Sequence, residues 1–219
     1  MSSIKLPHAS GNSMSIAAPA TNPASDLELK LPKTVGTGTI NHGNVLEQFF
    51  TSCDGSAITV PSGTYTVGNV TATQAITETH AEVTGSSISY TPPPGTTQVI
   101  YEFHFIGGED NANQKFLVHY KLQIDSTDIT NSRRSVYKEQ HGYTENIDFK
   151  YAINIGGSAS TTTGRQATWT SAKTLRIMAR EFSANYASRL FELDYWDGST
   201  SQAIFIPPSI GITAIGTPS

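Results

Sequence analysis

The chain has 219 residues, of which 15% are charged, and its formal net charge is −4. Soluble globular domains average about 25% charged residues, and the 14 basic residues of this chain are scattered rather than clustered. A nucleic-acid-binding protein is expected to concentrate positive charge on one surface, so we exclude nucleic acid as a partner. The single cysteine, Cys53, has no partner within the chain, so disulfides do not hold this fold.

The sequence contains no segment that reads as a membrane span or a secretion signal. Residues 2–20 lack an apolar core of signal-peptide length, and no run of about 18 apolar residues occurs elsewhere. We therefore expect a protein that is made in a cytoplasm, stays soluble and does not insert into a membrane.

Residues 1–50 are predicted to form an amino-terminal arm. Short apolar groups with a period of two residues alternate there with small polar residues: Ile4 and Leu6; Met14 and Ile16; Leu27, Leu29 and Leu31. None of these groups is long enough to bury itself. The arm is either disordered, as its Ala, Ser, Asn and Pro content allows, or ordered by docking on another chain, and we favour an attachment segment.

The end of this arm is the one place where we expect a short helix. Between residues 44 and 51 the apolar side chains have roughly helical spacing, and they are Val45, Leu46, Phe49 and Phe50. Residues 51–84 are then predicted to form a connecting region around a β-hairpin, because the turn Pro61-Ser62-Gly63 lies between two apolar, alternating stretches. A further stretch, Lys173 to Asn185, fits either helix or strand.

Residues 85–219 are predicted to form a head domain made of strands. In residues 99–106 the large side chains Val99, Tyr101, Phe103 and Phe105 alternate with others and so share one face. Residues 116–125 and 147–155 alternate in the same way. From Val83 onward we count about seven or eight strands, with turn signals roughly every 10 to 20 residues. We expect an all-β jelly-roll sandwich, although the spacing does not separate it from an immunoglobulin-like sandwich.

Catalytic motifs are missing from the sequence. It has no G-x-S-x-G, no H-E-x-x-H and no glycine-rich phosphate loop. Glu102 and His104 share one strand face and His119 can face outward on the next strand, so a pairing register could join them in an acid–base or metal site. A polar stripe on a solvated sheet face is the commoner explanation. We expect no enzyme, no catalytic residue and no cofactor.

One short acidic loop is a second candidate for metal binding. Glu109, Asp110 and Asn111 follow a strand and could offer oxygen ligands to Ca²⁺. Such clusters usually mark only a turn, so we expect no metal.

Aromatic residues in or beside predicted loops are the candidate receptor contacts. They are Tyr137, His141, Tyr143, Tyr186, Tyr195 and Trp196. Aromatic rings can stack on sugar faces while neighbouring polar groups bind hydroxyls, and the same amphipathic character makes them anchors of protein interfaces. Packing between subunits or within the core is the alternative.

Five arginines could form a basic patch, and they are Arg133, Arg134, Arg176, Arg180 and Arg189. We expect them to pair instead with nearby acids, namely Glu139, Glu181, Glu192 and Asp194. Surface pairs of this kind contribute about 0 to 1 kcal/mol each.

The sequence as a whole resembles a family of tailed-phage fibre-like proteins, especially from marine viruses. The matching blocks are SIKLPHASGNSMSIAAPATNPASDLELKLP, VLEQFFTSCDGSAITVPSGTYT, GSSISYTPPPGTTQVIYEFHF, INIGGSA, GRQATWTSAKTLRIMAREF and YWDGS. In that family the carboxy-terminal domain is similar to a C1q/TNF-like jelly roll. The resemblance implies a virion structural protein, a homotrimer with an amino-terminal attachment segment, and it carries no catalytic motif.

Three functions are compatible with these sequence features. The first is a non-enzymatic tail fibre or spike, located in the virion, whose arm binds other virion proteins and whose head contacts a host-surface glycan or protein. The second is a capsid decoration protein that stabilises the particle. The third, a glycan hydrolase, is disfavoured because the loops lack suggestive pairs of carboxylates.

Overall fold

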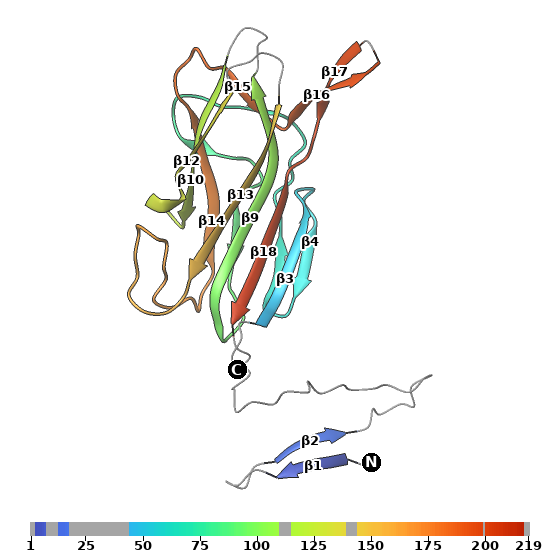
Figure 1. Ribbon diagram of the computed structural model, residues 1–219, viewed down its shortest axis with the longest axis vertical. Helices are drawn as coiled ribbons and strands as arrows, with labels where there is room; N and C mark the ends of the chain where they lie inside the picture. The colour runs from blue at the N-terminus through green and yellow to red at the C-terminus, as the bar shows by residue number, and fades with distance from the viewer. Residues whose placement is uncertain are drawn as a thin grey trace. The chain divides into compact units, whose positions relative to one another are not determined.

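The computed structural model describes residues 3–7, 13–17, 44–109, 115–138, 144–198 and 200–216 (Figure 1). The chain divides into two compact units, Met1–Ile40 and Asn41–Ser219. In the first unit, β1 (Ser3–Pro7) pairs antiparallel with β2 (Ser13–Ala17) and so joins two of the predicted apolar groups. The third predicted group, Leu27, Leu29 and Leu31, lies outside the described residues.

The first sheet of the second unit, called the β9 sheet, is organised around β9 (Thr96–Glu109). One edge of β9 pairs with β13 (Thr144–Asn154). The other edge pairs with β18 (Ser209–Gly216) and β15 (Ser188–Leu190). The sheet continues with β3 (Asn44–Ser52) beside β18 and β6 (Gln74–Ala75) beside β15.

The second sheet, called the β10 sheet, contains β10 (Phe116–Ile124) and β14 (Lys173–Glu181) at its centre. β10 also pairs with β12 (Arg134–Lys138) and β11 (Thr127–Asp128). β14 also pairs with β7 (Ala81–Glu82) and β8 (Ile88–Tyr90). All of these pairings are antiparallel.

Two hairpins stand outside the two sheets. The first joins β4 (Ala57–Val60) to β5 (Gly63–Thr66), as the Pro61-Ser62-Gly63 turn predicted. The second joins β16 (Glu192–Asp197) to β17 (Thr200–Phe205). The described residues contain one 3-10 turn, η1 (Thr130–Ser132), and no helix long and apolar enough to cross a membrane.

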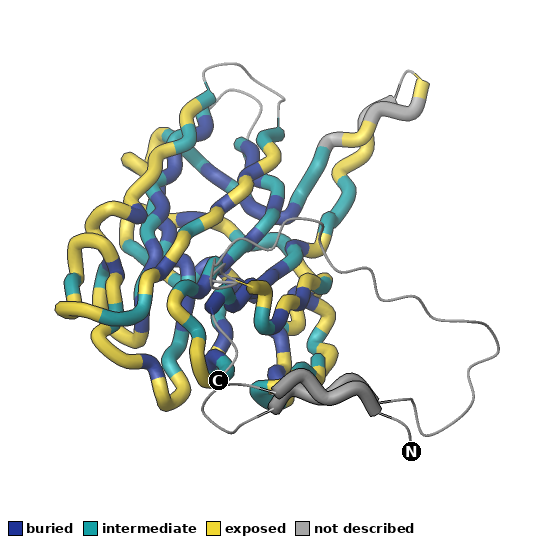
Figure 2. The backbone as a smooth tube through the Cα atoms, turned by 60° about the horizontal axis from the view of Figure 1, so that its bottom comes forward, coloured by how far each residue is buried: buried dark blue, intermediate teal, exposed yellow. Residues whose placement is uncertain are grey.

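The two sheets pack face to face as a sandwich. Inward-facing side chains of β9 and β10 alternate with partly exposed ones, and the ring of Phe105 lies 5.5 Å from that of Tyr120 across the core. Figure 2 shows the same alternation of buried and less buried residues along the strands. The main strands stand in the orders β3-β18-β9-β13 and β8-β14-β10-β12, and the chain passes repeatedly from one sheet to the other. The predicted all-β jelly-roll sandwich is confirmed.

The predicted helix at residues 44–51 is wrong, because these residues form β3 and pair with β18. The apolar pairs had suggested a helical repeat, but the pairing register shifts between Val45 and Glu47, so a β-bulge breaks the period of two. The ambiguous stretch from Lys173 forms β14.

The compact unit begins at Asn41, so β3 and the β4–β5 hairpin belong to the same unit as the rest of the sandwich. The division into an arm of residues 1–50, a connecting region of 51–84 and a head of 85–219 stays a prediction about function. Its boundaries do not coincide with those of the compact unit.

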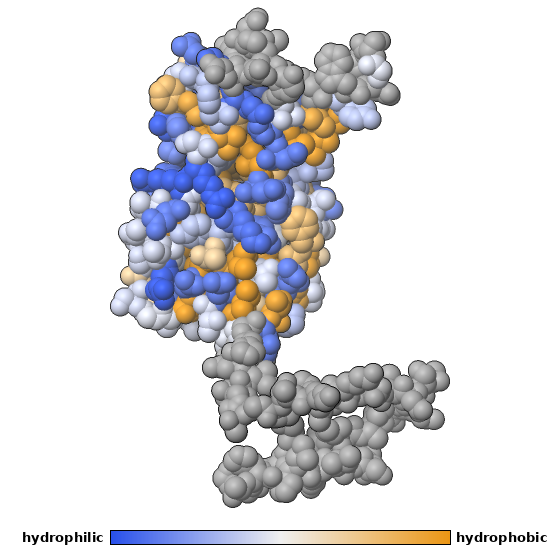
Figure 3. Space-filling model, viewed as in Figure 1, coloured by the Kyte–Doolittle hydropathy of each residue, from blue (hydrophilic) through white to orange (hydrophobic). Residues whose placement is uncertain are grey.

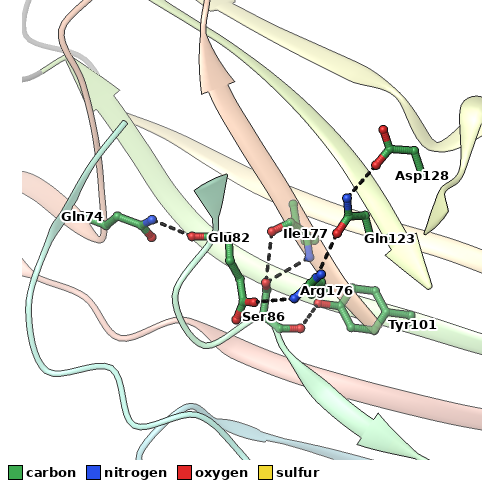
Figure 4. Close-up of polar contacts among 8 residues, drawn as sticks. All are labelled: Gln74, Glu82, Ser86, Tyr101, Gln123, Asp128, Arg176 and Ile177. Atoms are coloured by element: carbon green, nitrogen blue, oxygen red, sulfur yellow. Dashed lines mark hydrogen bonds and ion pairs between the residues drawn. The ribbon is translucent and has the colours of Figure 1, made fainter. Parts of the chain in front are cut away.

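A buried serine links the two sheets. Tyr101 of β9 donates its hydroxyl hydrogen to the Ser86 carbonyl, with 2.6 Å between the oxygens. The Ser86 hydroxyl in turn accepts from the backbone N–H of Ile177 in β14 at 3.0 Å (Figure 4). Both Ser86 and Tyr101 are 0% exposed, so each polar group needs this partner.

Tyr101→Phe is expected to lower the free energy of unfolding by about 1–2 kcal/mol, because it leaves the buried Ser86 carbonyl without its donor. Tyr120→Phe is the matched control, since Tyr120 is equally buried but its hydroxyl has no hydrogen-bond partner among the described residues. Urea denaturation should show a loss for the first variant and none for the second. Equal losses would contradict the role of this link.

Candidate functional site

The sandwich has two ends that differ in what they carry (Figure 1). At one, called the termini end, β3 begins at Asn44 opposite Gly216, where β18 ends. At the other, called the loop end, β9 ends at Glu109, β10 begins at Phe116 and β13 begins at Thr144. The chain therefore enters the sandwich at the termini end.

Three of the predicted contact residues are described with their side chains, and all three lie at the loop end. Tyr137 is close to the end of β12, Tyr186 lies just before β15, and Tyr195 is 51% exposed on β16. His141 and Tyr143 lie outside the described residues, as does the side chain of Trp196.

The structure brings Tyr137 and Tyr186 to the outer face of the β10 sheet, because Tyr137 pairs with the outward residue Leu117 and the Tyr186 ring packs on that of Phe182. Tyr195 belongs to the separate β16–β17 hairpin (Figure 1).

Tyr137 belongs to a line of side chains across that outer face, called the aromatic row and made of Tyr137, Leu117, Phe182 and Tyr186. Tyr137 pairs with Leu117, and the backbone N–H of Phe182 donates to the carbonyl of Leu117 at 3.0 Å. The rings of Phe182 and Tyr186 are perpendicular, with centroids 5.6 Å apart. Tyr137 and Phe182 are about half exposed, so the row offers apolar surface to a partner.

Phe182 was not among the predicted contact residues, although the sequence carried a signal for it. Arg176, Met178 and Arg180 occupy the outward positions of β14, and the period of two continues to Phe182. An aromatic residue at an outward position just after a strand could have been recognised as exposed.

Next to the aromatic row the same face contains a basic cavity of about 380 Å³. Its lining residues come from β10, β12, β14 and the segments before β7 and β12, and they are His80, His119, Tyr120, Lys121, Arg133, Arg134, Ser135 and Arg180. The register explains this convergence, because His119 stands opposite Ser135 on one side and Arg180 on the other. The His119 ring nitrogen Nδ1 lies 2.7 Å from the Ser135 hydroxyl.

Some of the positive charges around this cavity have a carboxylate partner and others have none. The Lys121 ammonium is 2.6 Å from the Asp128 carboxylate, and the Arg134 guanidinium donates to the Lys150 carbonyl and lies over the Phe149 ring. Arg133 and Arg180 have no carboxylate partner among the described residues.

The predicted ion pairs of the arginines are thus only partly correct. Arg189 pairs with Glu192 at 3.1 Å, as expected. Arg176 pairs with Glu82 at 3.5 Å and also donates to Gln123 (Figure 4). Glu181 points into the sandwich and accepts from the backbone N–H of Ser188, so it is not a surface partner of Arg180.

The cationic surroundings act on two histidines. Burial, followed by the charges of Lys121 and Arg180, lowers the pKa of His80, with an opposite effect from Asp128 and a further lowering by His119. Burial and the Arg180 charge lower the pKa of His119. Because nearby positive charge opposes protonation, the site is electropositive even before either histidine is charged.

The structure overturns the hypothesis that Glu102, His104 and His119 converge. Glu102 and His104 lie on the outer face of the β9 sheet, where they pair with Lys150 at 2.6 Å and Asp148 at 2.5 Å. His119 lies on the outer face of the opposite sheet. These residues form two polar surfaces separated by the core.

For the candidate calcium loop, Glu109 is the last residue of β9, while Asp110 and Asn111 lie outside the described residues. Among the described residues no three His, Cys, Asp or Glu side chains are grouped so that they could hold a metal ion.

A second cavity, of about 530 Å³, lies near the termini end between the three prolines Pro92, Pro93 and Pro94 and the segment around Trp169. One of its polar lining residues, Ser62, is already used internally. Glu47 is 5% exposed, and its carboxylate accepts from Ser62 at 2.6 Å and from the Tyr90 hydroxyl at 2.5 Å. This arrangement fixes the β4–β5 hairpin to β3 and β8, so we assign it a structural role.

No protein-family model matches the sequence, and no curated protein matches it. Among solved structures, one of infectious bursal disease virus Gx strain has a TM-score of 0.40 at 12% identity, covering 92% of this chain and 38% of that chain. One of the Gt strain of that virus has a TM-score of 0.28 at 10% identity, covering 86% and 47%. This chain spans less than half the length of either. These similarities are too distant to assign a function or a functional residue.

Lowering the pH from about 7.5 to about 5.5 is expected to destabilise the protein through His80 and His119. Their pKa values are lower in the folded state than the ordinary value, so below about pH 6.5 the unfolded chain binds more protons. The resulting loss of stability grows until the pH has passed the lower, folded pKa. In urea denaturation at both pH values, His80→Gln/His119→Gln should lose less stability than the unchanged protein. Equal losses in the two proteins would contradict this assignment.

Proposed function

We propose that this chain is a structural protein of a virus particle, a trimeric fibre or spike that contacts the host cell. The segment before β3 attaches it to other virion proteins, and the jelly-roll sandwich presents the contact surface. The phage fibre-like sequence blocks support this role, and so does the separation of Met1–Ile40 from the sandwich as a compact unit of its own.

The observation that carries the proposal is that the chain enters the sandwich at one end and exposes aromatic side chains at the other. The chain enters the sandwich at Asn44, at the termini end, whereas three of the four exposed aromatic residues among the described ones, Tyr137, Phe182 and Tyr195, lie at the loop end. A fibre head needs this polarity, because its anchor and its receptor contact must face in opposite directions.

The outer face of the β9 sheet supports the trimer. Val45 and Phe50 of β3 are each 57% exposed there, and Ile100 and Ile215 are partly exposed. Figure 3 shows hydrophobic side chains at several places on this face with a hydrophilic band between them. Such a mixed surface suits contact between subunits, in which exposed large apolar side chains become buried.

Immunogold electron microscopy with an antibody against the chain tests the location. We expect gold at the tail or its fibre tips and reduced adsorption of particles that lack the protein. Gold spread over the capsid, with unchanged adsorption and lower resistance to heat, would instead assign the chain to capsid decoration.

The trimer is tested by light scattering of the full chain at micromolar concentration, which should give the mass of three chains. Phe50→Asp is expected to yield monomers, because it places a charge where the proposed interface buries an aromatic ring. Tyr195→Asp, at a similarly exposed aromatic residue on the β16–β17 hairpin, is the control and should stay trimeric. A monomer that retains its β-sheet circular dichroism without any substitution would refute the trimer.

A further inference from the structure

We propose that the aromatic row and the basic cavity together form a binding site for an acidic carbohydrate. The cavity takes a carboxylate or sulfate group, and the aromatic row takes the face of a sugar ring. This inference rests on the proposed host-contact function and gives that contact a ligand class.

The first support is the free positive charge in the cavity. Arg180 projects from β14 and Arg133 from the segment before β12, and neither has a carboxylate partner among the described residues. A guanidinium group presents several N–H donors in a plane and binds an oxyanion with two parallel hydrogen bonds. Two such groups that line one cavity of about 380 Å³ provide a pocket for a single anionic group.

The second support is that two other basic residues on the same sheet face, Lys121 and Arg176, each have a carboxylate partner. Lys121 is matched by Asp128 at 2.6 Å, and Arg176 by Glu82 at 3.5 Å. The excess of positive charge is therefore local to the cavity, where Arg133, Arg134 and Arg180 have no carboxylate partner among the described residues. It is not a general property of the sheet or of the chain, whose net charge is −4.

The third support is the aromatic row directly beside the cavity. Arg180 holds the last outward position of β14, and Phe182 follows directly after the strand ends at Glu181. The Phe182 ring also lies 6.1 Å from the ring of His119, which lines the cavity. A sugar ring stacked on the row would thus hold its acidic substituent over the arginines, which is the amphipathic pattern that aromatic contacts with carbohydrates need.

The test measures binding of the full chain to immobilised polysaccharides by biolayer interferometry. Heparin provides sulfate groups, polygalacturonate provides carboxylates, and dextran is the neutral control. We expect binding to at least one acidic polymer and none to dextran. Arg180→Gln should weaken that binding about tenfold or more, because it removes charge-assisted hydrogen bonds.

Arg176→Gln is the matched control. It lies on the same strand and the same face, but its guanidinium is already paired with Glu82 and Gln123. Both substitutions remove one positive charge, so a general electrostatic attraction predicts equal losses, whereas the proposed site predicts a loss for Arg180→Gln alone. Equal losses, equal binding to dextran, or no binding to either acidic polymer would overturn the inference.

Two further measurements separate the parts of the site. Phe182→Ser should weaken binding to the polysaccharide while leaving competition by inorganic sulfate intact, because sulfate needs only the cavity. Binding to the acidic polymer should strengthen as the pH is lowered, because protonation of His80 and His119 adds positive charge to the cavity. Binding only to phosphatidylserine vesicles, with the same dependence on Arg180, would identify a lipid headgroup as the ligand and overturn the carbohydrate assignment.

The outcome is independent of where the protein sits in a particle, because the binding assay uses the isolated chain. A protein found at the tail that ignores acidic polysaccharides would overturn this inference and leave the proposed function standing. A protein that binds them through Arg180 but is absent from the tail would do the reverse.

Discussion

The burial of one face of β9 is the constraint on which the rest of the sandwich depends. Tyr101 and Phe103 are fully buried on that face, and both edges of the strand are occupied by hydrogen-bonded neighbours. A strand buried in this way must also satisfy its polar side-chain atoms. The Tyr101 hydroxyl does so through Ser86, which ties the β9 sheet to β14 of the opposite sheet.

This constraint leaves the outer face of the β10 sheet free for function. Because the inward positions of β10 and β14, apart from Glu181, hold core side chains, their outward positions can hold Arg176, Arg180 and His119 at no cost to the core. Antiparallel pairing then places side chains from distant parts of the sequence side by side. The basic cavity is a product of this register, with His80, His119 and Arg133 contributed by separate segments.

The sequence was informative wherever one period of two residues governed a whole strand. The alternation at residues 99–106, 116–125 and 147–155 predicted β9, β10 and β13 and their inner faces. The prediction failed at β3, where a bulge shifts the phase. The basic cavity could not be predicted from the sequence for another reason, because the ion-pair partner of each arginine depends on the strand register. Glu82 lies opposite Met178, next to Arg176, and no spacing in the sequence indicates this.

The comparison of Arg176 with Arg180 shows that this sheet face can place a carboxylate beside an arginine, so the positive charge of the basic cavity could have been neutralised. Both stand on the outer face of β14, and Arg176 has a carboxylate partner from the neighbouring strand, whereas Arg180 has none among the described residues. Arg180 instead lines the cavity together with Lys121 and two histidines. Burial lowers the pKa of both rings, and the Arg180 charge lowers both further. Like charges held together weaken the folded state slightly. A surface that needed only stability would place an acid there, so the uncompensated charge is more simply explained by an anionic ligand that supplies the missing partner.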